Sequence, residues 1–382
     1  MADSIDILLT GASGVLGGLV AGTLLTNEWC RIIAPIRKEH TREGVIGAIR
    51  AELDAGGIGN EADFERLITV PLPAIDQFQN FLPILQKFSV SEIINCAGSM
   101  DYGSPERLKQ GNIDLTNSLI WLGKQLQVKR FIHLSTAFSS GFTDGVIRET
   151  LHESPGIDPT EYTRSKREAE FLVADSSLPY LILRPSIVIG NSHDGHYAGK
   201  SSGLYQFWAA AEKILCDKYR PEFYLVAPAT KLNLVHQDAF RSSFLAAYKY
   251  LPDNSILHQV SHEATLPTVR QLTELWNEYC FRTSRVTYFD RLCDVPRDKL
   301  DHRMRTYLEV TSINNLIAAH SWQFETTNLD RLCANGLKFV DTTIDTVRIC
   351  QDYFINHSPR LLSFLKRIDE DRSVSMTCGE TR

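Results

Sequence analysis

Two residues whose side chains can move a proton lie four positions apart in the chain, Tyr162 and Lys166. The surrounding segment, residues 161–170, is rich in helix-forming residues, so both side chains should lie on one helical face. A nearby ammonium group stabilises a tyrosinate, and we therefore expect Lys166 to lower the pKa of Tyr162 into a range useful for proton donation. The pair alone is weak evidence, because many surface helices carry this spacing by chance.

Two hydroxyl residues, Ser135 and Thr136, directly follow an apolar run at residues 130–134 that reads as a strand. Active sites of open α/β sheets form at the carboxyl ends of the strands, so either hydroxyl could join Tyr162 in holding a reacting oxygen. Residue types and spacing alone do not decide between them.

A glycine-rich turn stands near the start of the chain, between the strand expected at Ile5–Leu9 and the apolar helix expected at Leu16–Leu25. Its glycines have the spacing Gly-x-x-Gly-x-x-Gly, which lets backbone N–H groups and a helix N-terminus approach a pyrophosphate. The alternative is a tight strand-to-helix turn without a ligand. We interpret the turn as a dinucleotide site; its cofactor-binding residues are expected to be Gly11, Ser13, Gly14, Val15, Leu16 and Gly17.

The residues after the second expected strand, Arg31–Pro35, indicate which dinucleotide binds. An acidic residue about 20 positions past the glycines is typical of NAD sites, whereas arginine is typical of NADP sites. Here Arg37 and Lys38 follow the strand, with Glu39 beyond them. Arg37 can pair with a 2′-phosphate through two N–H groups, so NADP(H) is favoured. The alternative is that Arg37 is only a solvated strand end.

The fourth expected strand ends in small residues. Asn95 is followed by Cys96, Ala97 and Gly98, and small side chains are needed where backbone lies against a cofactor. We therefore expect Asn95, Ala97 and Gly98 to contact it. Many strands end in Ala-Gly, so the position of this segment carries the argument.

The first half of the chain alternates short β-rich runs with longer amphipathic stretches, which predicts a Rossmann-type, doubly wound parallel α/β sheet. The predicted domains are a nucleotide-binding domain at 1–190 with strand and helix return segments near 225–250, and a smaller substrate-binding subdomain over most of 191–366. Residues 367–382 are expected to form a disordered tail. The six predicted strands are Ile5–Leu9, Arg31–Pro35, Leu67–Val70, Glu92–Asn95, Arg130–Leu134 and Tyr180–Arg184.

Composition narrows the classes of partner. A net charge of -6 over 382 residues offers no basic surface for nucleic acid. No stretch approaches the roughly 18 apolar residues of a membrane span. The eight scattered cysteines form no Cys-x-x-Cys pair, so we expect reduced thiols in a cytoplasmic protein and no zinc site. His193 and His196 lack a third residue spaced to complete a metal site.

With these elements in order, the chain resembles the extended short-chain dehydrogenase/reductase superfamily over roughly residues 5–240. Further matches lie at Leu183–Gly190 and Asn233–Asp238. The resemblance implies a nicotinamide-dependent oxidoreductase in which Tyr162 protonates the oxygen and Lys166 binds the nicotinamide ribose. It favours Thr136 over Ser135, because Thr136 immediately precedes Ala137. It also implies a role for Asn112 in the catalytic set, and places along the cofactor Tyr162, Lys166, Pro185, Ser186 and Val188.

Within that superfamily the chain is similar to the fatty acyl-CoA reductases and thioester reductase domains. The similarity rests on Leu134–Phe138, Arg184–Val188, the Arg37–Lys38 pair with the helix expected at Arg42–Leu53, and a short match at Trp322–Leu329. The last segment could equally be structural, with buried aromatic residues before a helix start. The implied reaction is hydride transfer from NADPH to an acyl thioester of CoA or an acyl carrier protein, giving an aldehyde or alcohol.

Several interpretations stay open. Another extended-family enzyme, acting on a ketone, an alcohol or a nucleotide sugar, is the main alternative, and an NADP-binding regulator without chemistry is a third. The acid that usually follows the third strand to contact adenine is missing, since Val70–Pro73 is followed by Asp76 only three residues later. The aromatic segment Leu204–Trp208, in a helix expected over Leu204–Leu215, could line an acyl channel or belong to the core. Oligomeric state is not predicted.

Overall fold

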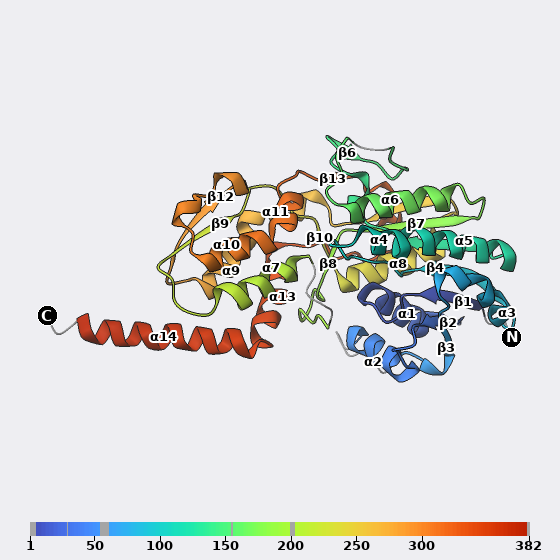
Figure 1. The fold of residues 1–382 in the computed structure, drawn as a ribbon, viewed down its shortest axis with the longest axis horizontal. Helices are drawn as coiled ribbons and strands as arrows, with labels where there is room; N and C mark the ends of the chain where they lie inside the picture. Colours follow the sequence, from blue (N-terminus) through green and yellow to red (C-terminus); the bar gives the residue numbers. More distant parts are fainter. Residues whose placement is uncertain (1–4, 29, 54–60, 154–155, 199–202, 380–382) are drawn as a thin grey trace.

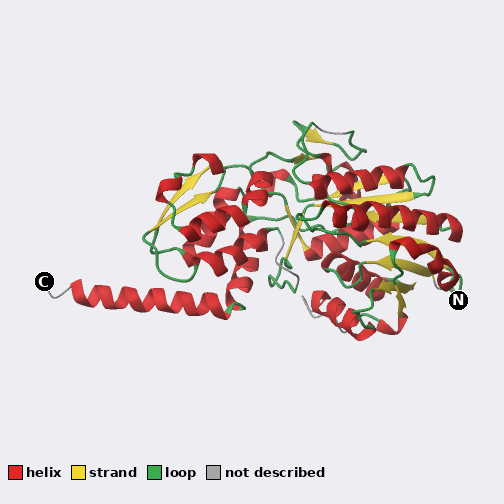
Figure 2. Ribbon diagram, viewed as in Figure 1, coloured by secondary structure: helices red, strands yellow, loops and turns green. Residues whose placement is uncertain are grey.

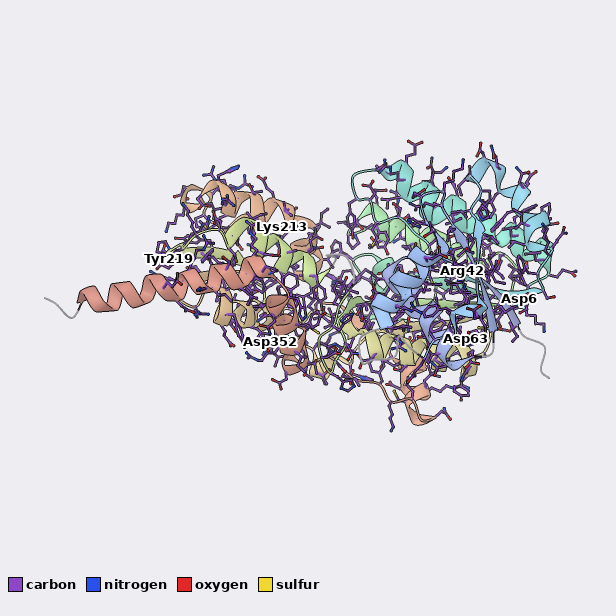
Figure 3. All side chains as sticks on the ribbon, turned by 90° about the horizontal axis from the view of Figure 1, so that it is seen from below. Asp6, Arg42, Asp63, Lys213, Tyr219 and Asp352 are labelled. Carbon is purple, nitrogen blue, oxygen red and sulfur yellow. The ribbon has the colours of Figure 1, made fainter. Side chains whose placement is uncertain are left out.

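The computed structural model describes residues 5–28, 30–53, 61–153, 156–198 and 203–379. Two lobes lie side by side, one built around a large sheet and the other mostly helical (Figure 1). Positions 199–202 of the segment expected to form the substrate-binding subdomain, and positions 380–382 of the expected tail, lie outside the described residues. Figure 3 labels three side chains on each lobe, Asp6, Arg42 and Asp63 on the sheet lobe and Lys213, Tyr219 and Asp352 on the helical lobe.

The main sheet has seven parallel strands in the order β11-β7-β5-β4-β1-β2-β3. Six of them match the strands predicted from the sequence. The strand order reverses between β1 and β4, and ligands of such sheets bind at this point, beyond the carboxyl ends of the strands. The strands are β1 (Ile5–Thr10), β2 (Cys30–Ile36), β3 (Leu67–Pro71), β4 (Val90–Asn95), β5 (Arg130–Leu134), β7 (Tyr180–Pro185) and β11 (Ser255–Gln259).

Successive side chains of each strand point to opposite faces, so near-continuous apolar strands build two cores. Leu9 packs in one core and Leu8 in the other. Figures 1 and 2 show helices covering both faces, which confirms the doubly wound Rossmann-type fold. One face carries α1 (Val15–Asn27), α2 (Arg42–Leu53), α8 (Gln237–Tyr250) and α12 (Thr327–Ala334), and the other carries α3 (Leu82–Leu85), α5 (Leu115–Leu126) and α6 (Glu161–Ala174).

Short helical segments lie in the loops of this lobe, several of them beside the expected site. They are η2 (Phe64–Arg66), η3 (Ile75–Phe81), α4 (Pro105–Leu108), the π-helical η4 (Lys109–Asp114) and η5 (Ala137–Ser140). π-helical turns often mark functional positions. The turn η4 leads directly into α5 and contains Asn112.

The helical lobe has its own apolar core, in which Tyr205, Trp208 and Trp276 are buried. The helix predicted at Leu204–Leu215 is present as α7 (Leu204–Ala210) and the π-helical η6 (Ala211–Leu215). The other elements are β9 (Glu222–Val226), η7 (Glu263–Thr265), α9 (Val269–Cys280), β12 (Arg285–Phe289), η8 (Leu292–Asp294), η9 (Arg297–Lys299), α10 (His302–Val310), α11 (Ser312–Ala318), α13 (Ile344–Asn356) and α14 (Pro359–Gly379).

The chain passes between the lobes more than once. The pairs β8 (Ile187–Ile189) with β10 (Leu234–His236), and β6 (Val146–Ile147) with β13 (Gln323–Phe324), link distant segments. The return segments differ from the sequence expectation of 225–250. The helix α8 lies there, but β9 pairs with β12 in the other lobe, and the returning strand β11 lies further along the chain. Which segments return to the main sheet is decided by pairing between strands far apart in the sequence. Local sequence patterns do not predict such pairing.

The expected disordered tail is also different in the structure. Residues 367–379 continue α14, which projects from the helical lobe (Figure 1). The first turns of α14 are anchored by Leu361, Phe364 and Ile368 in the core. Extending a helix that packing has already nucleated costs little, which explains how a polar segment remains helical.

Candidate active site

The glycine turn connects β1 to α1 at the point where the strand order reverses. Gly11 has a φ of +78°, and a Cβ there would lie 2.7 Å from the Ala97 nitrogen. A Cβ on Gly17 would lie 2.0 Å from the Gly11 carbonyl oxygen. Gly11 is therefore required for the turn to lie against the end of β4, and Gly17 for α1 to begin close against the turn.

The N-terminus of α1 is open to a ligand. Gly14 caps the helix without a side-chain hydrogen bond, and the first turn holds no acidic residue. Ser13 and Gly14 are exposed, and Val15 and Leu16 are half-buried. Free N–H groups and the positive end of the helix dipole suit a pyrophosphate, so this part of the chain fits a dinucleotide.

The basic pair after β2 lies at the surface. Arg37 has a side chain 70% exposed, with a long ion pair of 3.8 Å to Glu39. Lys38 is exposed beside it. His40, which the sequence analysis did not single out, has its Nδ1 3.5 Å from the Ser13 hydroxyl of the glycine turn. Arg37 is therefore free enough to turn toward a phosphate near that turn.

The end of β4 divides into backbone and side-chain roles. Ala97 is half-buried against Gly11, as expected of a small residue beside a cofactor. The Asn95 side chain is fully buried, accepting from the Thr10 hydroxyl (2.8 Å) and donating to the Thr116 hydroxyl (3.0 Å). The prediction that Asn95 contacts the cofactor is therefore wrong for its side chain, because neighbouring strands and α5 already occupy its polar atoms.

Asn112 ties three parts of the site together from η4. Its Oδ1 accepts from the Ser99 backbone N–H (2.8 Å), and its Nδ2 donates to the Ser165 hydroxyl (2.9 Å). The Ser165 hydroxyl in turn donates to the Tyr162 carbonyl (2.8 Å). A Cβ on Gly98 would lie 2.8 Å from the Asn112 Oδ1. Asn112 thus fixes the loop after β4 and the first turn of α6.

The structure separates the two hydroxyl candidates after β5. Ser135 donates its proton to the Glu170 carboxylate, which also accepts from Ser139 (2.9 Å). Thr136 caps η5, and within the described part of the chain its hydroxyl accepts a single long bond, 3.4 Å from the Phe138 N–H. The Ser135 hydroxyl is already committed, so Thr136 is the one with a proton to offer a ligand.

Glu170 is itself held from below by a buried ion pair. Arg184 donates to it through Nε (3.0 Å) and Nη2 (2.7 Å), and both side chains are fully buried. Arg184 also reaches the carbonyl oxygens of Arg148 and Thr150. A bidentate guanidinium–carboxylate pair defines geometry well, so it fixes α6 against β7 beneath the site.

Tyr162 lies half-buried at the start of α6, with the ring of Tyr102 edge-on at 6.0 Å between centroids. Burial first, and Tyr102 second, raise the pKa of Tyr162 above its ordinary value. The sequence prediction that Lys166 lowers this pKa is therefore wrong for this structure. The physical reason is that the Lys166 ammonium is turned toward β5.

Lys166 is buried, and its Nζ donates to the Leu134 carbonyl at 2.5 Å. His133 Nε2 lies 3.5 Å from the same nitrogen. Burial lowers the pKa of Lys166 to about 8, while Glu170 and Cys96 favour its charged form. Lys166 therefore stands beside the hydroxyl residues that follow β5 and is mostly cationic at neutral pH.

The segment after β7 offers an unpaired polar group. Ser186 is buried, and its hydroxyl has no hydrogen-bond partner among the described residues, although its N–H donates to the Gln259 carbonyl at 3.1 Å. Pro185 ends β7, and Val188 lies half-buried in β8. A buried hydroxyl without a partner costs free energy, so it fits a site that a polar ligand completes.

Other expected site features are placed as follows. Asp76 is exposed in η3, after β3. His193 is exposed near Asp238, and His196 Nε2 donates to the Ala51 carbonyl at 2.8 Å. Across the described residues, no group of three or more His, Cys, Asp or Glu side chains is arranged for a metal.

The aromatic segments serve packing. Trp322 is buried, lies edge-on to Phe138 at 4.9 Å between centroids, and donates its indole N–H to the Ile317 carbonyl. Phe324 joins the same cluster, which supports the structural interpretation of that segment. Trp322 also borders a cavity of about 600 Å³ whose wall includes Lys231 and Arg291.

The segment Leu204–Trp208 belongs mainly to the helical core, as the structural alternative predicted. Tyr205 nevertheless borders a cavity of about 450 Å³, together with Tyr197, Glu212 and Phe354. The linings of these two cavities therefore do not identify an acyl channel along this segment.

The structure thus brings together the glycine turn, the end of β4, Thr136 and the α6 pair at one edge of the sheet. Sequence reasoning missed Tyr102, His133, Glu170 and His40. His133 left a signal, since it is a histidine between apolar residues of a strand. Tyr102 left none, because its loop is placed only by the tertiary fold.

These features define a nicotinamide-dependent oxidoreductase of the extended short-chain dehydrogenase/reductase class. The chain belongs to the male sterility protein family, whose model matches residues 9–236. A search of curated protein sequences found no match. Among the described residues, no helix has both the length and the apolarity needed to cross a membrane.

Solved structures share the fold at low sequence identity. The terminal R domain of the myxalamid PKS-NRPS pathway is 19% identical, with a TM-score of 0.71 over 94% of this chain and 92% of that one. A thiolation-reductase di-domain of an archaeal non-ribosomal peptide synthetase is 18% identical, with a TM-score of 0.70 over 93% and 75%. UDP-glucuronic acid 4-epimerase from Bacillus cereus, in complex with NAD, is 16% identical, with a TM-score of 0.60 over 92% and 97%.

Proposed function

We propose that the protein is an NADPH-dependent reductase of acyl thioesters, acting on acyl-CoA or on an acyl group held by a carrier protein. The observation that carries this is the combined likeness to the male sterility family and, over both lobes, to terminal reductase domains. The product would be an aldehyde, or the alcohol after a second reduction. The cytoplasmic location expected from the sequence stays part of this proposal, as does a nucleotide-binding domain at 1–190 completed by return segments, with a substrate-binding subdomain over most of 191–366.

The residues of the site suit this chemistry. NADPH, when bound, supplies a hydride ion for the acyl carbonyl carbon. The hydroxyls of Thr136 and Tyr162 would donate hydrogen bonds to the oxygen as its negative charge develops, in a site that burial keeps dry. Tyr162 would then give the oxygen its proton. The product of that protonation is a hemithioacetal, and loss of its thiol leaves the aldehyde. Lys166 would bind the nicotinamide ribose throughout.

The choice of NADPH rests on Arg37. Its exposed guanidinium lies at the end of β2, close in sequence to His40, which contacts the glycine turn. We expect Arg37→Ala to weaken NADPH binding roughly tenfold or more, the loss of a charge-assisted bond, while NADH binding changes little. Fluorescence titration with both dinucleotides measures this. Equal losses for the two would assign Arg37 a role other than 2′-phosphate recognition.

The decisive test of the reaction uses purified protein, NADPH and a panel of thioesters of different acyl length on CoA and on carrier protein. The expected result is NADPH oxidation with an aldehyde or alcohol found by product analysis. No oxidation with any thioester, together with turnover of a ketone or a nucleotide sugar, would assign the protein to the alternative activities. Tightly bound NAD in the purified protein would favour an epimerase.

A further inference from the structure

Three polar side chains form a row across the main sheet where apolar residues would be expected. Thr10 pairs in register with Asn95, and Asn95 pairs with His133, at the carboxyl ends of β1, β4 and β5. All three point to the face covered by α5 and α6, because their neighbours Leu8 and Phe131 pack in that core. Each is at least 98% buried. Burying polar groups this deeply costs free energy unless they find hydrogen-bond partners.

Close polar contacts follow the row to Lys166. Thr10 donates to Asn95 at 2.8 Å, and the Asn95 amide nitrogen lies 3.4 Å from His133 Nδ1. The other ring nitrogen, Nε2, lies 3.5 Å from Lys166 Nζ. His133 therefore stands between the buried row and the lysine, with one ring nitrogen facing each side.

We propose that His133 is a positioning residue for Lys166, whose Nε2 accepts from the ammonium and, with the Leu134 carbonyl, aims it at the nicotinamide ribose. This rests on the proposed function only in that Lys166 must serve a bound nicotinamide cofactor. The ring is suited to accept, because burial and Lys166 lower the pKa of His133 and keep it neutral. A neutral imidazole accepts at one nitrogen only, and the charged ammonium is a stronger donor than the Asn95 amide, so Nε2 accepts and the proton sits on Nδ1. The 3.4 Å contact of Nδ1 with the Asn95 amide nitrogen, itself a donor, is then a packing contact and not a hydrogen bond.

The charged groups around Lys166 set the expected direction of the effect. Glu170 on α6 and Cys96 after β4 favour the ammonium, and burial opposes it, with a resulting pKa of about 8. Tyr162 lies one turn away on α6. An acceptor at His133 Nε2 also favours the ammonium. Removing that acceptor should therefore lower the pKa of Lys166, so that the lysine loses its proton at a lower pH.

The test compares His133→Phe, which removes the acceptor, with His133→Gln, whose Oε1 can replace Nε2. His236→Gln is the matched control, since His236 is also buried but bonds to the Gly190 carbonyl and Thr346. Binding of NADPH and of adenosine 2′,5′-bisphosphate is titrated by fluorescence and calorimetry from pH 6 to 9, or NADH and ADP if NADH binds more tightly. Only the dinucleotides carry the nicotinamide ribose.

In the wild type, the advantage of the dinucleotide over its fragment should weaken as pH rises through about 8. In His133→Phe the midpoint should fall by roughly one pH unit, so that at pH 7.5 the charged fraction of Lys166, and with it dinucleotide binding, should fall about threefold. Fragment binding should not change. His133→Gln should restore the midpoint, and His236→Gln should leave it at the wild-type value.

An unchanged or raised midpoint in His133→Phe would overturn the proposal, as would an equal loss of dinucleotide and fragment binding, which indicates a purely structural role. These measurements need no turnover. Absence of thioester reduction would therefore refute the proposed function and leave this result intact, so the two failures are distinguishable.

Discussion

Replacing Gly17 with alanine tests the glycine turn directly. A Cβ at Gly17 would lie 2.0 Å from the Gly11 carbonyl oxygen, whereas ordinary contact begins at 3.4 Å, so the parts must separate by 1.4 Å (3.4 less 2.0). The obstacle is backbone, which no side-chain rotation relieves. The same oxygen accepts the Gly14 N–H at 2.9 Å, and that bond would be lost as the turn opens.

The two costs can be added. Overpacking of this kind costs about 1–3 kcal/mol, and a lost backbone hydrogen bond costs about 1 kcal/mol more. We expect Gly17→Ala to reduce the free energy of unfolding by roughly 2–4 kcal/mol on these grounds. The shift also moves the α1 N–H groups off a pyrophosphate, and losing one or two charge-assisted bonds should weaken NADPH binding roughly 100-fold.

Urea unfolding followed by circular dichroism and NADPH fluorescence titration measure the two effects. Gly47→Ala is the matched control, because Gly47 is exposed in the middle of α2 and a Cβ there meets nothing within 4 Å. That variant should gain about 1 kcal/mol from helix propensity and bind NADPH as the wild type does. If Gly17→Ala bound NADPH within about threefold of wild type with unchanged stability, our reading of how closely this turn packs would be refuted.

Three further predictions follow from the site and its supports. For the proposed thioester reduction, Tyr162→Phe should lower kcat about 10²–10⁴-fold, because the proton donor is lost while the aromatic ring stays in place; full activity in the thioester assay would contradict this. Glu170→Gln should cost about 3–5 kcal/mol in urea unfolding, because Arg184 keeps a buried charge without its partner; adding Arg184→Met should recover part of it, and no recovery would argue against the pair. Burial raises the pKa of Glu52 from 4.5 to about 7, so its favourable contribution is complete below pH 4.5 and is lost as pH rises through 7. At pH 8, Glu52→Gln should therefore raise the free energy of unfolding in urea by up to about 3 kcal/mol, and the new amide can still accept the hydrogen bond from Gln237. If the stability of wild type and variant had the same pH dependence, Glu52 would be excluded as the cause.

Local patterns in the sequence were sufficient to predict the sheet lobe. Six of its seven strands and the helices α1 and α2 follow from apolar runs and their spacing, since strand and helix periods are local properties. The glycine turn was predicted equally well from its glycine spacing. Only glycine fits at positions 11 and 17, where a Cβ would collide with backbone atoms. The tyrosine and lysine spacing predicted that both side chains belong to one helix, α6.

Tertiary structure alone decided the rest. The seventh strand, β11, joins the sheet after a long excursion through the other lobe, and no local period reports such pairing. The role of Asn95 was mispredicted because its polar atoms are used by neighbours 85 and 21 residues away. The direction of Lys166, toward Leu134 and His133 and away from lowering the pKa of Tyr162, depends on how α6 packs on β5. Residue types and spacing determine which groups are present, and burial and long-range contacts determine which of them are free to react.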